Sequence, residues 1–202
     1  MYASTSSVYG ANTKLPFSEK DSVDNPISLY AASKKSNELV AHVYSKMYGI
    51  NLIGLRFFTV YGPWGRPDMA IFKFTNLIVN DKPIDIYNNG NHSRDFTYID
   101  DIVDGIFKIL DFTLNNKSMK SGYEIYNIGN SHPVKLLEII KILEVVIGKK
   151  AVKNYIELQS GDVLDTYADI SKLQNIVNYI PRVDIGAGIK NFYSWYKAYY
   201  ES

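Results

Sequence analysis

Apolar positions recur along the chain at two spacings, one typical of strands and the other typical of helices. Short apolar or alternating runs predict strands ending near residue 4 and over 51–58, 84–87, 123–128 and 152–158. Spacings of three and four predict helices over 28–47, 69–80, 97–112, 133–147 and 186–200. Strands that alternate with helices in this way predict an α/β fold.

The first predicted helix carries a continuous apolar stripe. Its members are Leu39, Val40, Val43, Tyr44 and Met47. A stripe of this width on a helix normally faces a hydrophobic core. We therefore expect these side chains to pack against the rest of the domain.

Composition narrows the class of protein. With 202 residues, of which 46% are apolar and 21% charged, the chain can bury a substantial core in one domain or two small lobes. A net charge of +1 provides no basic field that would favour nucleic acid or an anionic membrane. The absence of cysteine excludes disulfides, thiolate zinc sites and cysteine nucleophiles, and the three histidines lack metal-ligand spacing. No apolar run approaches the roughly 20 residues of a membrane-spanning helix.

Tyr30 and Lys34 lie four residues apart in the first predicted helix and therefore share one of its faces. A free tyrosine has a pKa of about 10, but a neighbouring ammonium group favours the phenolate and makes the tyrosine a usable base. On this spacing alone, a surface lysine beside a half-buried tyrosine is the favoured interpretation. The hydroxyl-rich stretch 3–10, with sequence ASTSSVYG, favours the catalytic one, with Thr5 orienting the substrate hydroxyl.

Two threonines follow predicted strands. Thr5 comes at the end of the first apolar run, and Thr59 comes directly after the run 51–58. In open parallel sheets, ligands bind beyond the carboxyl ends of the strands. We therefore expect Thr5 and Thr59 to face the same crevice.

Several motifs together carry a family resemblance. Besides STSSVYG at 4–10 and Tyr30-x-x-x-Lys34, they are RFFTVYGPWGRPDMA at 56–70 and RDFTYIDD at 94–101. The chain resembles the extended short-chain dehydrogenase/reductases that modify nucleotide sugars, and among them the UDP-glucuronate 4-epimerases. The likeness runs over essentially the whole chain.

The resemblance implies the C-terminal part of a Rossmann-type parallel sheet with a smaller α/β substrate-binding lobe. It assigns 1–65 and 96–129 to the NAD-binding domain, and 66–95 and 130–202 to the nucleotide-sugar-binding lobe. No glycine-rich dinucleotide loop follows a strand here, and the family carries that loop upstream of the catalytic threonine. We therefore expect the chain to be the C-terminal portion of a longer enzyme. The resemblance also implies a homodimer formed through the first predicted helix, and a cytoplasmic role in nucleotide-sugar metabolism and polysaccharide biosynthesis.

The resemblance further implies NAD as the cofactor and assigns roles around it. Tyr30 would remove the C4 hydroxyl proton of the sugar, and Thr5 would hydrogen-bond the same oxygen. Lys34 would bind the nicotinamide ribose and lower the pKa of Tyr30. Phe57 is either part of the apolar wall beside the nicotinamide or an ordinary strand residue.

Ser6 and Ser7 bear on the reaction type. Sugar 4,6-dehydratases of the superfamily carry an acidic pair at these two positions, because elimination of water needs a general acid and a general base. Decarboxylating relatives usually keep a glutamate at the second position. Two serines here disfavour elimination and favour epimerisation.

Arg66 and Thr59 are the candidate contacts for a substrate carboxylate. Oxidation at C4 of a glucuronate creates a β-keto acid, which loses carbon dioxide when the carboxylate bond lies perpendicular to the carbonyl. A fork of donors from Arg66 and Thr59, assisted by Ser6 or Ser7, could bind the carboxylate and prevent that orientation. Alternatively, Arg66 pairs with Asp68 at the surface.

Three further positions are matched to the nucleotide by resemblance. Arg94 corresponds to the diphosphate-binding arginine, Tyr87 to an aromatic that borders the uracil, and Asp162 to a residue near the nucleotide ribose. Arg56 ends a buried strand and is interpreted as structural.

Two alternatives stay open. A neutral-sugar epimerase acting on UDP-glucose would use the same catalytic residues. Without the glycine-rich loop, the chain could instead be an inactive fragment or a UDP-sugar-binding module that holds no NAD.

Overall fold

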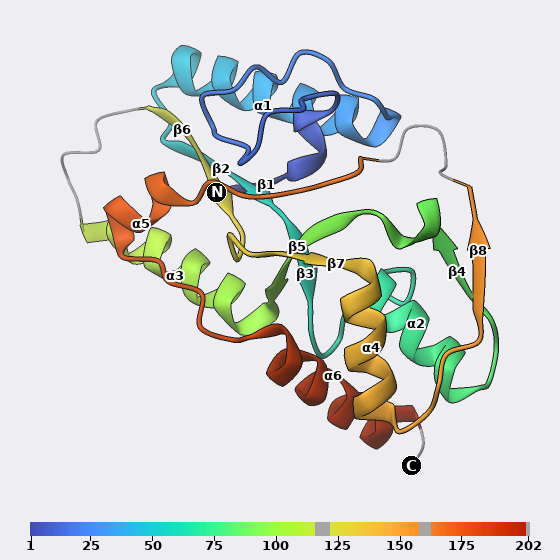
Figure 1. Ribbon diagram of the computed structural model, residues 1–202. Coiled ribbons are helices and arrows are strands. Elements are labelled where there is room, and N and C mark those ends of the chain that lie inside the picture. The colour runs from blue at the N-terminus through green and yellow to red at the C-terminus, as the bar shows by residue number, and fades with distance from the viewer. Residues whose placement is uncertain (116–121, 158–162, 201–202) are drawn as a thin grey trace.

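The computed structural model describes residues 1–115, 122–157 and 163–200, and it confirms the α/β fold with parallel strands (Figure 1). The main sheet has the order β1-β2-β6, and its strands, Tyr2–Thr5, Leu52–Phe57 and Tyr123–Ile128, all run parallel. A second sheet has the order β3-β5-β7, with strands Thr59–Tyr61, Ser93–Tyr98 and Pro133–Lys135. The third is the parallel pair of β4, Ile84–Tyr87, and β8, Lys153–Ile156.

Helices cover both faces of the main sheet. Helix α1, Leu29–Tyr48, lies on one face, and α3, Ile99–Asn115, and α5, Ser171–Val177, lie on the other (Figure 1). The remaining helices are α2, Ala70–Val79, α4, Leu136–Ile147, and α6, Ile185–Tyr200. Helix α4 packs against both α2 and α6, and α2 lies beside β4. Two short 3-10 turns are η1, Ser6–Tyr9, and η2, Asn88–Gly90. Within the described ranges, no helix has both the length and the apolar character needed to cross a membrane.

The fold has two hydrophobic cores. One lies around the main sheet and includes Val8, Ile53, Leu55, Ile109, Ile128 and Tyr179. The other lies between α2, α4 and α6 and includes Ile78, Ile86, Ile139, Leu143, Ile189 and Phe192. Residues 168–179 contribute to the first core, although the sequence-based division assigns all of 130–202 to the smaller lobe.

The prediction that the apolar stripe on α1 packs in the core was wrong. Its five side chains, Leu39, Val40, Val43, Tyr44 and Met47, are between 48% and 66% exposed. The opposite face of α1 buries Ala31, Glu38 and Ser45. Because this inward face holds only small and hydrogen-bonding side chains, the large apolar ones point away from the sheet.

The segment that follows Pro133 also differs from the sequence prediction. Residues Pro133–Lys135 form β7, which pairs antiparallel with β5, so α4 begins only at Leu136. This pairing joins segments about 40 residues apart, and such long-range partners override the local helical pattern. Strand β3 and helix α5 were not predicted because both are short.

Glu144 joins the end of α4 to β8. Its carboxylate accepts hydrogen bonds from Lys153 Nζ at 2.9 Å, from Lys150 Nζ at 3.2 Å and from the backbone N–H of Ala151 at 3.0 Å. Burial raises the pKa of this carboxyl, but the three donors outweigh burial and lower the pKa to about 2. The folded protein therefore favours the ionised form.

We expect this carboxylate to make stability depend on pH in acid. A folded-state pKa below the unfolded value gives stabilisation that is complete above about pH 5 and is lost as pH falls toward about 2. Glu144→Gln should lower the Tm at pH 7 and reduce the loss of Tm between pH 5 and pH 2. Thermal melts of both proteins across this range test the expectation, and parallel Tm profiles would contradict it.

Candidate active site

A cavity of about 650 Å³ opens where β1 and β2 end and where β3 begins. Eight of the residues singled out in the sequence line it, and they are Thr5, Ser6, Ser7, Tyr30, Lys34, Phe57, Thr59 and Arg66. The parallel register pairs Thr5 with Phe57, so the two strands end at the same level. Side chains from distant segments therefore meet at one edge of the sheet.

The start of α1 presents Tyr30 and Lys34 to this cavity. Ser28 caps the helix by accepting a hydrogen bond from the Ala31 N–H at 3.1 Å, which places Tyr30 in the first turn. The Tyr30 side chain is about half exposed, and Lys34 Nζ lies 6.0 Å from the centre of its ring. Lys34 Nζ also donates to the carbonyl oxygen of Ala3 at 3.2 Å, which ties α1 to β1.

Thr5 is held by the 3-10 turn that follows it. Its Oγ1 accepts the N–H of Ser7 at 3.2 Å and donates to Ser7 Oγ at 3.2 Å. The turn ends at Gly10, whose φ of 55° and whose distance from the Asn25 carbonyl leave no room for a Cβ. Thr5 and Ser7 therefore have defined positions at the rim of the cavity.

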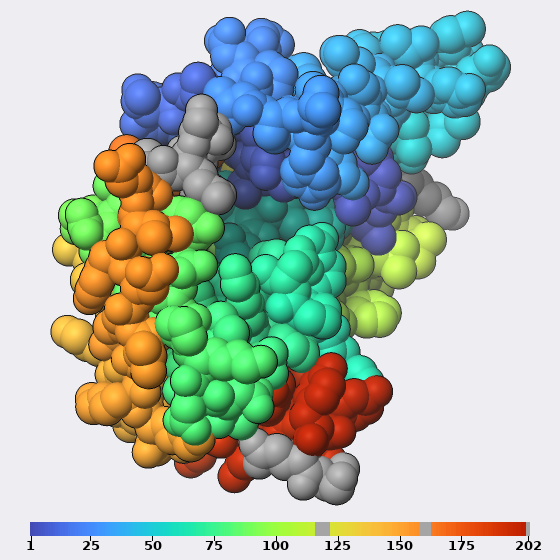
Figure 2. All heavy atoms as spheres, turned by 90° about the vertical axis from the view of Figure 1, so that its right-hand side faces the viewer, coloured from blue at the N-terminus to red at the C-terminus, as the bar shows by residue number. Residues whose placement is uncertain are grey.

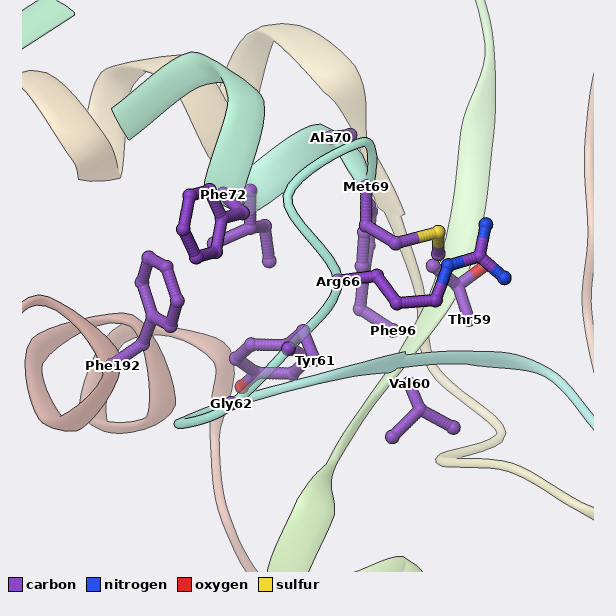
Figure 3. Close-up of a pocket in the computed structure, with 12 residues that line it drawn as sticks. Thr59, Val60, Tyr61, Gly62, Arg66, Met69, Ala70, Phe72, Phe96 and Phe192 are labelled. Atoms are coloured by element: carbon purple, nitrogen blue, oxygen red, sulfur yellow. The ribbon is translucent and has the colours of Figure 1, made fainter. Parts of the chain in front are cut away.

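Arg66 lies between two possible partners. Its guanidinium pairs in two-pronged fashion with Asp68, through Nε at 3.0 Å and a second contact through the terminal nitrogen. The same side chain lines the cavity together with Thr59, and Figure 3 shows both at one end of a small inner pocket. In the resting structure the surface pairing with Asp68 is thus formed, within reach of the cavity.

Of the residues matched to the nucleotide, Arg94 and Tyr87 are described by the structure and are not among the cavity-lining residues. Arg94 donates to the carbonyl oxygens of Ser93 at 3.0 Å and Leu164 at 2.8 Å, and so fixes the segment beginning at 163. Tyr87 ends β4, away from the side chains that line the cavity. Asp162 lies outside the described residues.

Sequence reasoning missed two features of the site. Glu38 is buried beneath the cavity and accepts two hydrogen bonds from Arg56. The burial and pairing of Arg56 agree with its interpretation as a structural residue. Trp64 lines the cavity, is 72% exposed and packs on Trp195 with ring centres 5.2 Å apart. Glu38 has a visible signal, because it follows Lys34 by one helical turn and shares its face. Trp64 has none.

The donors at the cavity fit one end of a dinucleotide. The cavity is lined by the half-exposed side chain of Tyr30, by Lys34, and by the aromatic rings of Phe57 and Phe58. Such a set suits a ribose hydroxyl and a flat apolar ring, as in the nicotinamide half of NAD.

Comparisons with known proteins agree with this geometry. The NAD dependent epimerase/dehydratase family matches residues 1–129. The chain is 52% identical over 212 residues to Protein CapI of Staphylococcus aureus, covering 100% of this chain and 64% of that protein. It is 50% identical to UDP-glucuronate 4-epimerase 4 of Arabidopsis thaliana, covering 99% of this chain and 48% of that one.

Solved structures give the same picture. The UDP-glucuronic acid 4-epimerase of Bacillus cereus, in complex with UDP-glucuronic acid and NAD, superposes with a TM-score of 0.89 at 39% identity. The match covers 98% of this chain and 61% of that one. MoeE5, in complex with UDP-glucuronic acid and NAD, gives a TM-score of 0.87 at 30% identity, covering 98% of this chain and 64% of that one.

The chain thus spans between about half and 64% of the length of these relatives. The alignments, however, cover 98% to 100% of this chain. The family match covers more than half of the chain and includes the hydroxyl-rich stretch 3–10 and the pair Tyr30 and Lys34. The chain belongs to the NAD-dependent epimerase/dehydratase family.

Proposed function

We propose that this chain carries the catalytic residues of a UDP-glucuronate 4-epimerase, which converts UDP-glucuronate to UDP-galacturonate through a transient 4-keto sugar. The observation that carries the proposal is the convergence of Tyr30, Lys34, Thr5, Thr59 and Arg66 on one cavity. The relatives named for this activity, at about 50% identity, support it. Held beside Tyr30, Lys34 and Phe57, NAD would supply the site with a reversible hydride acceptor for C4 of the sugar.

In this proposal, residues near the start of α1 carry out the proton transfer. Tyr30 takes the proton of the C4 hydroxyl and later returns it to the same oxygen, which Thr5 Oγ1 holds by a hydrogen bond. The ammonium group of Lys34 lies 6.0 Å from the centre of the Tyr30 ring and would bind the ribose of the cofactor. Phe57 contributes an apolar wall, while Ser6 and Ser7 offer no carboxylate for elimination.

In this proposal, Arg66 and Thr59 determine the specificity for a sugar that carries a carboxylate. Arg66 binds the Asp68 carboxylate through two guanidinium nitrogens. The C6 carboxylate of the substrate would make the same two contacts and so displace Asp68. Both partners are exposed, and an exposed ion pair is weak, so the exchange meets little resistance. Ser6 or Ser7 adds a hydroxyl contact.

The rest of the nucleotide would extend toward the smaller lobe. We assign Arg94 to the diphosphate, Tyr87 to the uracil and Asp162 to the ribose, with 66–95 and 130–202 as the nucleotide-sugar lobe. A separate second core between α2, α4 and α6 supports such a lobe, although residues 168–179 pack in the first core.

The exposed stripe on α1 supports a homodimer. Five adjacent apolar side chains, Leu39, Val40, Val43, Tyr44 and Met47, stand on one helical face without partners in the chain's own core. A contiguous apolar face of this kind typically marks an interface. A second copy of α1 would cover it.

Tyr30→Phe tests the reaction. It removes only the proton-transferring oxygen, so turnover of UDP-glucuronate in the presence of NAD should fall roughly 10²- to 10⁴-fold with little change in KM. Tyr48→Phe, at the far end of the same helix, is the matched control and should keep full turnover. A wild-type chain that binds UDP-glucuronate without turning it over would instead favour the binding-module alternative.

Arg66→Lys tests the carboxylate contact. Lysine keeps the charge but loses the fork, so affinity for UDP-glucuronate should fall roughly tenfold while affinity for UDP-glucose stays within about twofold. The chain has two tryptophans, and Trp64 lines the cavity, so tryptophan emission reports binding. Arg182→Lys, which lies outside the cavity, is the control. Equal losses for both sugars would reject the clamp and favour the neutral-sugar alternative.

Val43→Asp tests the dimer. A charge in the middle of the α1 stripe should convert a dimer to monomer in sedimentation or size-exclusion experiments, because a buried unpaired charge is strongly unfavourable. Val145→Asp, on the exposed side of α4, is the control and should leave the dimer intact. A wild-type protein that stays monomeric at all concentrations would reject the proposal.

A further inference from the structure

A buried charged pair lies directly behind the cavity. Glu38, on α1, accepts hydrogen bonds from both arms of Arg56, through Nε and a terminal nitrogen, each at 2.9 Å. It also accepts a hydrogen bond from Ser4 Oγ at 2.6 Å. All three residues are at most 3% exposed, so solvent does not share in these contacts.

The pair is attached to the helical face that carries the proposed base. Glu38 follows Lys34 by four residues and Tyr30 by eight, which places the three side chains in one row along α1. Lys34 binds the carbonyl oxygen of Ala3, and Glu38 binds Ser4. Helix α1 is therefore held at two consecutive residues of β1, and the next residue in the strand is Thr5.

Apolar packing does little to fix this helix. Its buried side chains besides Glu38 are Ala31 and Ser45, and both are small. A planar guanidinium–carboxylate fork, in contrast, has one preferred geometry and constrains both rotation and sliding. Besides an edge contact of His42 with Tyr123, ring centres 5.2 Å apart, polar contacts therefore orient α1 against the sheet, with Glu38 and its partners at the buried centre.

Arg56 is itself anchored on its other side. Its guanidinium lies 4.9 Å from the centre of the Tyr9 ring, and the Tyr9 hydroxyl donates to Asn127 Oδ1 at 2.7 Å. Burial raises the pKa of Tyr9 to about 12, so the phenol stays neutral and remains a donor. Asn127 in turn donates to the carbonyl oxygens of Phe17 and Asp169. The network thus connects α1 to β2, β6 and two loop segments.

Stability alone does not account for a buried pair of this kind. Replacing a buried ion pair with apolar side chains of similar volume is often neutral or stabilising, whereas removing one partner is strongly destabilising. The pair offers directionality, which an apolar contact lacks. Here the pair fixes the orientation of α1, the helix that carries Tyr30 in its first turn.

We propose that Glu38, through its fork with Arg56, is a positioning residue for Tyr30, which it holds at the height and rotation that bring the phenol oxygen and Thr5 Oγ1 to one substrate oxygen. The proposal rests on the function proposed for Tyr30. A displacement of about 1 Å at a reacting group can reduce turnover by about 10²-fold, so small rotations of α1 matter.

Three variants separate positioning from folding. Glu38→Gln leaves Arg56 with an unpaired charge and lowers the Tm. The double variant Glu38→Leu/Arg56→Met removes both charges and is expected to recover the Tm. Glu144→Gln disturbs a buried carboxylate in the other core and is the control for general destabilisation.

We expect kcat and Tm to change independently of each other in these variants. Glu38→Gln and the double variant should both lose roughly 10- to 100-fold in kcat, with KM for UDP-glucuronate within about twofold. Glu144→Gln should keep wild-type kcat despite its lower Tm. A double variant that regains wild-type kcat together with its Tm would overturn the proposal, because apolar packing would then suffice.

A second measurement does not depend on catalysis. A 3-fluorotyrosine placed at position 30 should give one sharp fluorine resonance in the wild-type chain and a broadened or multiple resonance in the double variant. An unchanged single resonance would overturn the positioning role even if the chain turned over no substrate. Conversely, loss of the single resonance in a chain without turnover would support the positioning role while contradicting the proposed function.

Discussion

Parallel pairing of β1 with β2 is the constraint on which the site depends. The register that pairs Thr5 with Phe57 ends both strands at one level, and the chain then continues into η1 on one side and β3 on the other. Segments about 50 residues apart thereby deliver hydroxyls and an apolar wall to the same edge of the sheet. In open α/β sheets ligands bind in the crevice beyond the carboxyl ends of the strands, which is the edge that these side chains share.

Helix α1 completes the site with an unusual distribution of side chains. Its polar and small residues face the sheet, and its large apolar residues face outward (Figure 2 shows the region of the chain that contains α1, in blue, across the top of the molecule). The inward face therefore holds the helix through hydrogen bonds and the Glu38–Arg56 fork. The outward face is left to bind a second copy in our proposal. One helix thus carries the proposed base, the element that orients it and the proposed interface.

Much of this could be predicted from the sequence, and the reasons are physical. Periodicity located most strands and helices, and the rule that parallel strands end at a common edge brought Thr5 and Thr59 together. Helical spacing singled out Tyr30 and Lys34, the family resemblance added Arg66, and the family itself was confirmed. The cytoplasmic setting stays a prediction.

What the sequence did not predict depends on partners distant in the chain. An apolar stripe indicates that α1 has an apolar face, but not whether that face meets the chain's own core or another molecule. The antiparallel pairing of β7 with β5 and the burial of Glu38 against Arg56 are likewise set by tertiary contacts. The sequence left open whether Arg66 pairs with Asp68 or faces the substrate. In the structure Arg66 pairs with Asp68, and its side chain also lines the cavity.

The most direct test of the central claim follows the hydrogen at C4. UDP-glucuronate labelled with deuterium at C4 should give UDP-galacturonate that keeps the deuterium at C4, because the hydride leaves and returns within one closed site. The same reaction with unlabelled substrate in D₂O should place no deuterium at that carbon. Retention of the label under both conditions is the result we predict. Exchange of the C4 hydrogen with solvent, or no product from a chain that binds the sugar nucleotide, would contradict the account.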